Sequence, residues 1–410
     1  MNKLKFIIIS YYSFPYNAIS ALRISHFANF MAQKNHKIYF IKADNKYYRN
    51  LIDDKLKLDD KIEQVSIAIR PTNNPSLSRV RFTLKIAEKI KKIIKKEKID
   101  FLFFCSDPFW YLPLGPIFKI FYNIPYIIDF RDIMYRHPIF DLHKYNKFSD
   151  MISDKFLESL YIKYSKFIID VTDENTDFHR KIYKNQPENK FITIANGYDS
   201  KLINNFNKSN TILNNILNNE SLNDEILKRK LKLAISGKFA FYGLEDVDLL
   251  LKLENINIEL AKKIEIIAIG RDNPIFKEKA KNARFLTFTF HNQMSQLDAF
   301  NILKDSDILL LNNNQKTALG TKIFDYIGLN KPIFAFVEKD YAIWKLLQKF
   351  ENAFIIQNED DLVKALNEVL NKNIRYLTKN EDLINNYSRD NQYAKLEKIL
   401  IENFSNFTNK

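Results

Sequence analysis

The chain has 410 residues, 46% of them hydrophobic, and a formal net charge of +14. This length exceeds what one hydrophobic core usually fills and the apolar fraction argues against a disordered chain, so we expect two folded domains. A single cysteine excludes a disulfide scaffold and any cysteine-based zinc or iron–sulfur site. The basic balance favours an anionic partner, which leaves nucleic acid, an anionic membrane surface and a phosphorylated small molecule as candidates.

In the first half of the chain, short apolar runs alternate with helical patterns. The predicted strands are 6–10, 37–41, 65–69, 101–105, 126–129, 167–171 and 191–194. Helices are predicted after the loop 11–20 and at 82–98, 116–121, 153–165 and 174–183. Strands that are apolar on both faces and alternate with helices indicate a parallel sheet of βα units.

The same alternation restarts after an Asn-rich segment, 204–224, which is the best linker or insertion candidate. The predicted strands are 231–236, 264–269, 284–288, 307–311 and 332–336, and the predicted helices are 246–261, 295–304, 321–329 and 340–349. We therefore expect an α/β fold with two doubly wound domains, 1–195 and 196–378, followed by amphipathic helices at 379–410. Ligands of such sheets bind at the carboxyl ends of the strands, so the cleft between the domains is the predicted site.

No apolar run is long enough for a signal peptide or a membrane span. The longest, 112–128, is interrupted by Pro113, Pro116, Lys119 and Pro125. We therefore expect a cytoplasmic protein whose membrane contact, if any, is peripheral.

The most informative segment is 317–332, TALGTKIFDYIGLNKP, which follows a predicted strand. Gly320 permits a tight turn into a helix whose first-turn N–H groups and dipole favour an anion. Thr321 adds a hydroxyl and Lys322 a cation, while Asp325 lies one turn further on the same face, where a carboxylate is placed to accept ribose hydroxyls. This pattern predicts a nucleotide site. The alternative is an ordinary helix cap with a surface Lys–Asp pair.

Several motifs, in this order and spacing, resemble those of GT-B glycosyltransferases, in particular glycosyltransferase family 4. Segment 319–332 resembles the family's "TGKLFEYLAAGKP" signature. The other matching segments are ISYYSFP at 9–15, ALR with FA at 21–28, DFRD at 129–132, NGYD at 196–199 and SDILLL at 306–311. The resemblance covers nearly the whole chain. It implies two Rossmann-like domains, with a C-terminal helix that crosses back to the first domain.

The resemblance also implies a retaining transfer of a sugar from a nucleotide-sugar donor. The acceptor would be a bacterial surface polysaccharide such as capsule or lipopolysaccharide, or a lipid-linked glycan. Asp325 matches the second acidic residue of the family's Glu-x7-Glu element, which binds the donor ribose, whereas the first position is Thr317 and is not acidic. Gly320, Thr321 and Lys322 would hold the diphosphate. The family needs neither a metal nor a cofactor, and no metal-ligand spacing is present.

Further candidates lie at other strand ends. Gly237 and Lys238 resemble a family loop in which Lys238 would reach the β-phosphate. The alternative for Lys238 is a solvated surface position. Gly270 and Arg271 follow the next strand, with Arg271 near phosphate or base, or in a plain turn.

The DFRD motif ends a strand of the first domain. Asp129 and Asp132 flank Arg131, so together they can orient an acceptor hydroxyl and hold a phosphate oxygen. The alternative is a salt-bridge network that shapes the loop. Arg23, in the first helix, is a further candidate for a phosphate contact. His137 and His143 follow the motif and are candidates for acceptor contact or packing.

The helix 82–98 carries an apolar stripe of isoleucines, and lysines crowd its remaining faces. The lysines predict either a plain solvated surface or a patch drawn to anionic lipids. Three rival functions remain: a GT-B nucleotide-sugar epimerase, a non-catalytic GT-B scaffold in polysaccharide assembly, and a nucleic-acid-binding protein. Because no base-reading motif accompanies the lysines, we expect no nucleic-acid partner.

Overall fold

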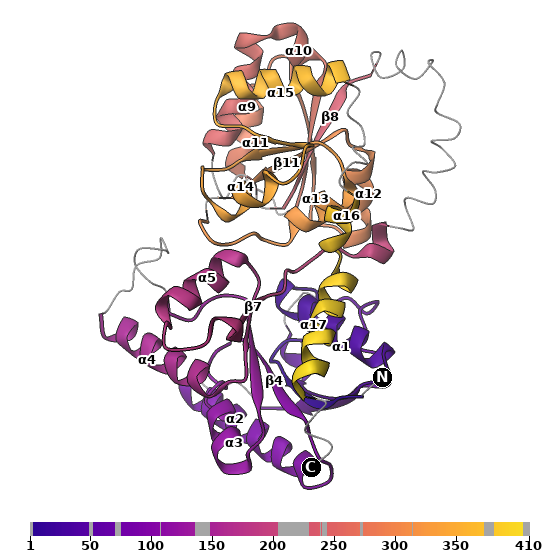
Figure 1. The fold of residues 1–410 in the computed structure, drawn as a ribbon. Helices are drawn as coiled ribbons and strands as arrows, with labels where there is room; N and C mark the ends of the chain where they lie inside the picture. The colour runs from indigo at the N-terminus through magenta and orange to yellow at the C-terminus, as the bar shows by residue number, and fades with distance from the viewer. Residues whose placement is uncertain are drawn as a thin grey trace. The chain divides into compact units, whose positions relative to one another are not determined.

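The computed structural model describes residues 3–48, 52–69, 75–106, 108–135, 148–203, 229–237, 239, 244–270, 274–313, 315–372 and 381–404. The chain divides into two compact units, Met1–Asn196 with Asp390–Lys410, and Gly197–Arg389. Each unit holds one parallel sheet with helices around it (Figure 1). The predicted two-domain α/β fold is therefore confirmed. No helix among the described residues is long and apolar enough to span a membrane.

The first unit is built on a seven-stranded sheet in the order β3-β2-β1-β4-β5-β6-β7. Its strands are β1 (Lys5–Ile9), β2 (Lys37–Ala43), β3 (Glu63–Ile67), β4 (Phe101–Cys105), β5 (Tyr126–Phe130), β6 (Ile168–Asp170) and β7 (Phe191–Thr193). Its helices are α1 (Ile19–Gln33), α2 (Pro75–Ile94), α3 (Leu114–Tyr122), α4 (Phe148–Tyr164), α5 (Asp173–Ile182) and α17 (Arg389–Phe404), with short 3-10 turns at Asn45–Tyr47 and Glu188–Lys190.

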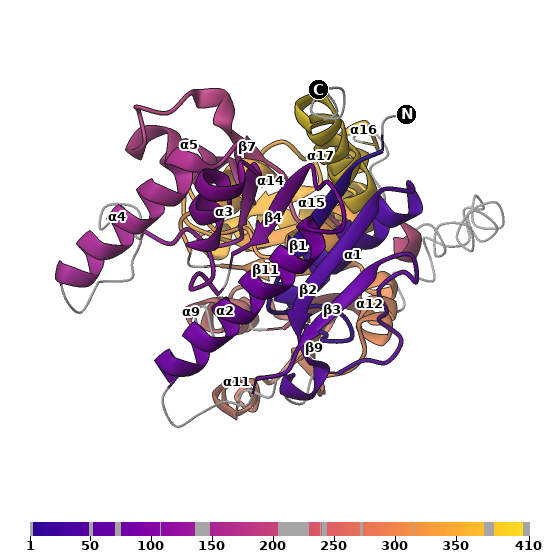
Figure 2. The same cartoon turned by 90° about the horizontal axis from the view of Figure 1, so that it is seen from below.

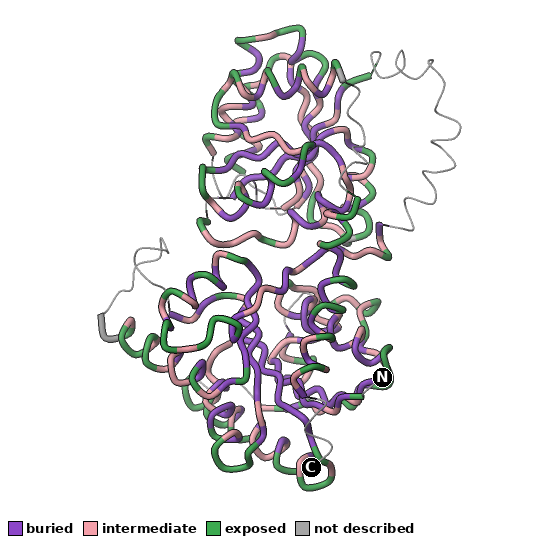
Figure 3. Tube along the Cα trace, viewed as in Figure 1, coloured by how far each residue is buried: buried purple, intermediate pink, exposed green. Residues whose placement is uncertain are grey.

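Both faces of this sheet are buried. On one face, Phe82 and Ile86 of α2, Phe118 of α3 and Ile162 of α4 pack on the strands. On the other face lie α1 and α17, whose contributions include Phe27, Met31, Leu396, Leu400 and Phe404. The Phe404 ring stacks on the Phe101 ring of β4, with 4.3 Å between centroids. The last helix among the described residues is thus part of the core of the first unit, and Figure 3 shows the strands buried between the two helical layers.

The second unit is built on a six-stranded sheet in the order β10-β9-β8-β11-β12-β13. Its strands are β8 (Leu231–Ser236), β9 (Ile264–Ile269), β10 (Thr287–His291), β11 (Ile308–Asn312), β12 (Ile333–Phe336) and β13 (Ala353–Ile355). Its helices are α9 (Glu245–Ile256), α10 (Ile258–Lys262), α11 (Pro274–Ala280), α12 (Gln296–Asp305), α13 (Lys322–Leu329), α14 (Ala342–Leu347), α15 (Glu359–Lys372) and α16 (Glu381–Asn386). The 204–224 segment lies outside the described residues.

Strand order reverses once in each sheet, where β1 pairs with β4 and β8 pairs with β11. The loops after those strands leave the same edge of the sheet in opposite directions. Ligands of doubly wound folds bind at this edge.

Several elements differ in detail from the prediction. The single helix 246–261 is broken at Asn257, whose side chain accepts a hydrogen bond from the Leu260 N–H and begins α10. The strand predicted at 284–288 begins only at Thr287. The reason is that Glu254 of α9 accepts hydrogen bonds from the backbone N–H groups of 284–286, at 2.6–2.9 Å, and removes them from the ladder.

A further difference is an omission, because α11, β13 and α15 were not predicted. β13 has three half-buried residues and gives almost no pattern. α15 has a clear start signal, since its first turn is Glu359, Asp360 and Asp361. The edge strand β3 is also displaced from 65–69, because its register is set by pairing with β2 and not by burial of its side chains.

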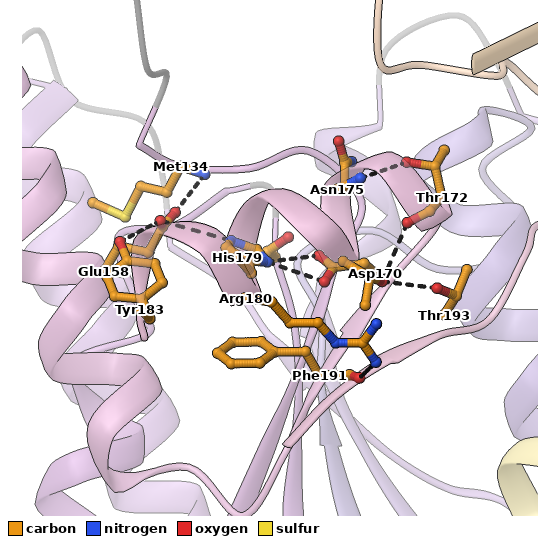
Figure 4. Close-up of polar contacts among 12 residues, drawn as sticks. Met134, Glu158, Asp170, Thr172, Asn175, His179, Arg180, Tyr183, Phe191 and Thr193 are labelled. Carbon is orange, nitrogen blue, oxygen red and sulfur yellow. Dashed lines mark hydrogen bonds and ion pairs between the residues drawn. The ribbon is translucent and has the colours of Figure 1, made fainter. Parts of the chain in front are cut away.

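A buried polar network joins α4, β6 and α5 (Figure 4). His179 lies between two carboxylates: its Nδ1 is 3.0 Å from Asp170 Oδ2, and its Nε2 is 3.7 Å from Glu158 Oε1. All three side chains have no exposed surface. The other Glu158 oxygen accepts hydrogen bonds from the backbone N–H groups of Met134 and Tyr135, both at 2.8 Å. The network therefore holds the chain that follows β5.

The charge state of His179 follows from its neighbours. Burial alone lowers the pKa of His179, but the carboxylates of Asp170 and Glu158 outweigh burial and raise the pKa to about 10. Burial also raises the pKa of Asp170, so the cluster retains its proton as the pH rises. Two carboxylates around one imidazolium make a charged, proton-holding core in the first unit.

We predict that His179→Gln lowers the free energy of unfolding by about 3–5 kcal/mol near pH 6, because it leaves two buried carboxylates without their cation. A folded pKa above the ordinary 6.5 means that the imidazolium stabilises fully below about pH 6.5 and that this contribution is lost as the pH rises toward 10. The difference between variant and wild type should therefore shrink with rising pH. Urea unfolding, with hydrogen exchange at Met134 and Tyr135 to assign the loss to this unit, measures it.

The matched control is His291→Gln on β10, where the expected change is on the order of 0.5 kcal/mol or less. A loss of stability at position 179 that stays constant with pH would show that the folded protein does not hold the proton there.

Candidate functional site

Two glycine turns meet at the carboxyl edge of the second sheet. Gly237 follows β8 and Gly270 follows β9, with φ values of 83° and 141°, which side-chain-bearing residues rarely adopt. A Cβ added to Gly270 would lie 2.8 Å from the Gly237 Cα. The adjacent loops are therefore packed backbone to backbone, and the sheet edge offers main chain rather than side chains to a ligand.

Lys322 lies over Gly237 and Gly270, which we call the glycine floor. Its Nζ donates a hydrogen bond to the Ser236 carbonyl, and a Cβ at Gly237 would fall 2.0 Å from the same Nζ. The structure thus brings together Gly237, Gly270 and Lys322, which come from three separate segments of the sequence. A cation above main chain that carries no side chains attracts phosphate oxygens and leaves room for them.

Tyr326 fixes the helix that carries Lys322. Its buried hydroxyl accepts a hydrogen bond from the Ser236 N–H at 3.1 Å and donates one to the Leu310 carbonyl at 3.3 Å. One side chain of α13 is therefore bonded to both β8 and β11. On the same helix Gly328 leaves room for Tyr198, since a Cβ there would come 2.7 Å from the Tyr198 ring.

Asp325 lies between these anchors on α13. It is half-buried, and its carboxylate has no hydrogen-bond partner among the residues that the structure describes. Burial raises the pKa of Asp325 to about 6, against the opposing charges of Arg389 and Lys322 and with a further rise from Asp199. A desolvated carboxylate with unused acceptor capacity is suited to bind hydroxyl groups.

Arg389 belongs to the same neighbourhood. Its Nε donates to the Gly197 carbonyl at 3.2 Å, and its guanidinium lies 3.5 Å from the Asp199 carboxylate. Gly197 is required there, because a Cβ would be 2.9 Å from the Arg389 nitrogen and φ is 68°. The NGYD segment is therefore held by the residue that begins α17.

The loop before α13 is ordered by Asn313, whose side chain donates to the Ala318 carbonyl and accepts from the Gln315 N–H, both at 2.9 Å. Gly320 has φ of 66° and open space around its Cα, consistent with a close approach by a ligand. Thr321 is the N-cap of α13, yet its side chain makes no capping hydrogen bond. Lys238 and Arg271, also predicted for this site, lie outside the described residues.

The DFRD motif has a different geometry from the one predicted. Asp129 is buried in a two-point ion pair with Arg23, with Nε–Oδ2 and Nη2–Oδ1 distances of 2.9 Å. The remaining Arg23 nitrogen donates to the Ala195 carbonyl and the Asn196 side chain, each at 3.2 Å. The Arg23–Asp129 pair thus ties α1 and the segment after β7 to β5, and this geometry favours the structural alternative for Asp129.

The other two residues of the motif differ from Asp129 in their exposure. The Arg131 N–H donates to the Ser106 hydroxyl at 3.2 Å and its side chain is half-buried, while Asp132 is exposed. The role predicted for Asp129, Arg131 and Asp132 at an acceptor stays a prediction. His137 and His143 lie outside the described residues.

The sequence analysis missed Tyr326 and Arg389. Tyr326 lies inside the segment that was singled out, and a tyrosine among apolar helix positions is a signal that its hydroxyl has a buried partner. Arg389 has no local signal, because its partners lie some 190 positions earlier in the chain. Among the described residues, no group of three or more His, Cys, Asp or Glu side chains is arranged to hold a metal ion.

Comparison with known proteins gives structural likeness at low sequence identity. No protein-family model and no curated protein matches the chain. A glycosyltransferase from Rickettsia africae superposes with a TM-score of 0.65 at 15% identity, over 98% of this chain and 99% of that one. HepE from Anabaena, solved with UDP-glucose, gives 0.60 at 11% identity over 97% and 100%. A UDP-GlcNAc 2-epimerase from Neisseria meningitidis, bound to UDP-GlcNAc, gives 0.58 at 13% identity over 97% and 100%.

At such identities the likeness concerns the fold. It extends over both units and over nearly the full length of each neighbour. Membership of glycosyltransferase family 4 in particular stays a prediction. The fold itself is the GT-B fold of glycosyltransferases, as the sequence motifs implied.

Proposed function

We propose that the protein is a retaining glycosyltransferase that moves a sugar from a nucleotide-sugar donor to a surface-polysaccharide or lipid-linked glycan acceptor. The observation that carries this proposal is the edge of the second sheet. There Lys322, which lies over Gly237 and Gly270, is one turn of α13 from Asp325, whose carboxylate has no hydrogen-bond partner among the described residues. This arrangement offers separate partners to a diphosphate and to ribose hydroxyls.

In the proposed reaction the acceptor oxygen forms a bond to the anomeric carbon as the bond from that carbon to the diphosphate breaks. The acceptor proton passes to a phosphate oxygen of the donor, so no enzymic base is required. Lys322 and the N-terminus of α13 stabilise the negative charge that grows on the leaving diphosphate. Neither a metal nor a cofactor is part of this proposal.

Two other functions are compatible with the fold. A nucleotide-sugar epimerase is favoured by the likeness to the Neisseria enzyme. It is distinguished by a product formed from the nucleotide sugar with no acceptor present. A non-catalytic scaffold is favoured by Thr317, which stands where the family has an acidic residue. It is distinguished by nucleotide binding with no turnover of any donor.

We also propose that the protein acts in the cytoplasm, at the inner face of the cytoplasmic membrane. The lysines of α2 support this location, since a basic cluster is attracted to anionic lipid by about 1 kcal/mol per Lys near the surface. Such a location would bring the protein to a lipid-linked acceptor.

The first experiment is a thermal-shift screen of the protein against UDP-, GDP-, ADP-, CMP- and dTDP-sugars. We expect one nucleotide class to raise the melting temperature selectively. Lys322→Ala and Asp325→Ala should then each weaken its binding by about 10- to 100-fold in calorimetry, as expected for losing a charged hydrogen bond of about 1.5–3 kcal/mol.

The matched control is Lys349→Ala, an exposed lysine of the same unit, which should leave affinity unchanged. Unchanged melting temperatures of the ligand-free variants separate binding from folding. Equal affinity for wild type and both site variants would overturn the assignment of this edge as the donor site.

A second prediction concerns pH. Because the pKa of Asp325 is raised to about 6, the carboxylate that accepts ribose hydroxyls is lost as the pH falls through that value. Donor affinity should therefore fall several-fold from about pH 7.5 to about pH 5.5. A nucleotide sugar is the right probe, because it carries no terminal phosphate group that titrates near pH 6.

Asp325→Asn keeps the shape of the side chain and removes the titration. Its affinity should be weak and nearly constant over the same range. A wild-type affinity that does not vary with pH would assign ribose binding to another group.

A further inference from the structure

Three helices on one face of the first unit expose large apolar side chains. α2, α3 and α4 lie next to one another over the same side of the sheet (Figures 1 and 2). We call six of their exposed apolar side chains the apolar ridge: Leu84 (63% exposed), Ile117 (43%), Ile120 (56%), Phe121 (76%), Ile152 (52%) and Phe156 (65%). Large apolar side chains exposed on neighbouring helices of one surface favour an interaction site.

α3 shows that the ridge is separate from the core. Leu114 and Phe118 point into the sheet and are buried. Ile117, Ile120 and Phe121 have the i, i+3, i+4 spacing of a second helix face, and they are exposed. The helix therefore has two apolar faces, and packing of the first unit accounts for only one of them.

Basic side chains border the ridge on α2. Segment 75–98 contains nine Lys and Arg residues and two Glu residues. One of the glutamates, Glu88, is shared by Lys85 and Lys92, at 2.7 and 2.8 Å. Lys91 lies over the Tyr122 ring of α3, 5.8 Å from its centroid, which places the basic end of α2 beside the ridge. The surface thus combines apolar side chains with a net positive rim.

We propose that the apolar ridge inserts into the interfacial region of an anionic lipid bilayer, with the lysines of α2 at the headgroups. Phe121 and Phe156 are the most exposed ring side chains of the ridge and act as its anchors. The α2 lysines provide the long-range attraction, and the ridge provides contact that salt does not screen. This inference deepens the proposed membrane location but depends on none of the donor-site residues.

Charge decides between a bilayer and a second copy of the chain. A two-fold dimer through the ridge would set one α2 lysine cluster against its copy, and like charges oppose such an interface. An anionic bilayer complements the lysines. Its fluid apolar layer also accepts an irregular row of side chains without a shaped pocket.

The test is sedimentation of the full chain with phosphatidylglycerol–phosphatidylcholine vesicles and with phosphatidylcholine vesicles alone. We expect binding only to the anionic vesicles. Ile117→Ser with Phe121→Ser should reduce the partition coefficient about tenfold or more. Glu at Lys91, Lys92, Lys95 and Lys96 should reduce it about 100-fold or more, and high salt should weaken the wild type.

Matched controls come from exposed positions elsewhere. Ile256→Ser with Ile275→Ser removes two exposed isoleucines of the second unit, and Glu at Lys262, Lys281, Lys349 and Lys398 makes the same change of charge. Neither should reduce vesicle binding by more than about twofold. All variants should keep the wild-type nucleotide affinity, so failure of the membrane inference and failure of the donor-site proposal are separate results.

Depth is measured with Phe121→Trp. Its fluorescence should shift to the blue on anionic vesicles and be quenched by lipids brominated along the acyl chain, beyond any change in the wild type, whose two tryptophans are Trp110 and Trp344. Absence of vesicle binding, or binding that survives both sets of ridge and lysine changes, would falsify the inference. So would a concentration-dependent dimer, formed without lipid, that Phe121→Ser abolishes, because it would assign the ridge to a second copy.

Discussion

The second unit depends on one hydroxyl group. Tyr326 hydrogen-bonds to Ser236 at the end of β8 and to Leu310 within β11, the two strands between which the strand order reverses. Because the loops after these strands diverge, this is the place where a ligand can approach the backbone. A rigid bond from α13 to both strands therefore sets where Lys322 and Asp325 lie relative to Gly237.

Close packing at this edge of the sheet explains where several glycines lie. The chain has only seven, and four of them, Gly197, Gly237, Gly270 and Gly320, have positive φ in loops of the second unit. Gly237 and Gly270 cannot carry a Cβ because another backbone or the Lys322 side chain occupies that space. Because glycine is scarce elsewhere in the chain, these positions can be recognised in the sequence. The donor site was therefore predicted from short sequence segments around these glycines. The structure brings several of these segments together.

The first unit shows where sequence reasoning fails. The alternation of apolar runs predicted nearly every strand, because parallel strands buried on both faces have an unambiguous composition. Side-chain partners could not be predicted in this way, since Asp129 pairs with Arg23 rather than with its neighbour Arg131. His179 likewise has no ligand spacing in the sequence, and its carboxylates come from β6 and α4. Pairings across the fold leave no periodic trace, so only the structure separates a buried ion pair from a catalytic group.

The same distinction changes the meaning of the net charge. Some cations are used within the fold: Lys331 donates to the Lys304 and Ser306 carbonyls, and Lys190 to the Lys163 carbonyl. Burial lowers the pKa of Lys190 to about 8, so its charge is partly lost at mildly alkaline pH. Such lysines cannot meet an outside partner, although they count fully in the +14 of the sequence. The lysines of α2 are exposed and adjoin exposed apolar side chains, and attraction to an anionic surface depends on that position rather than on the total.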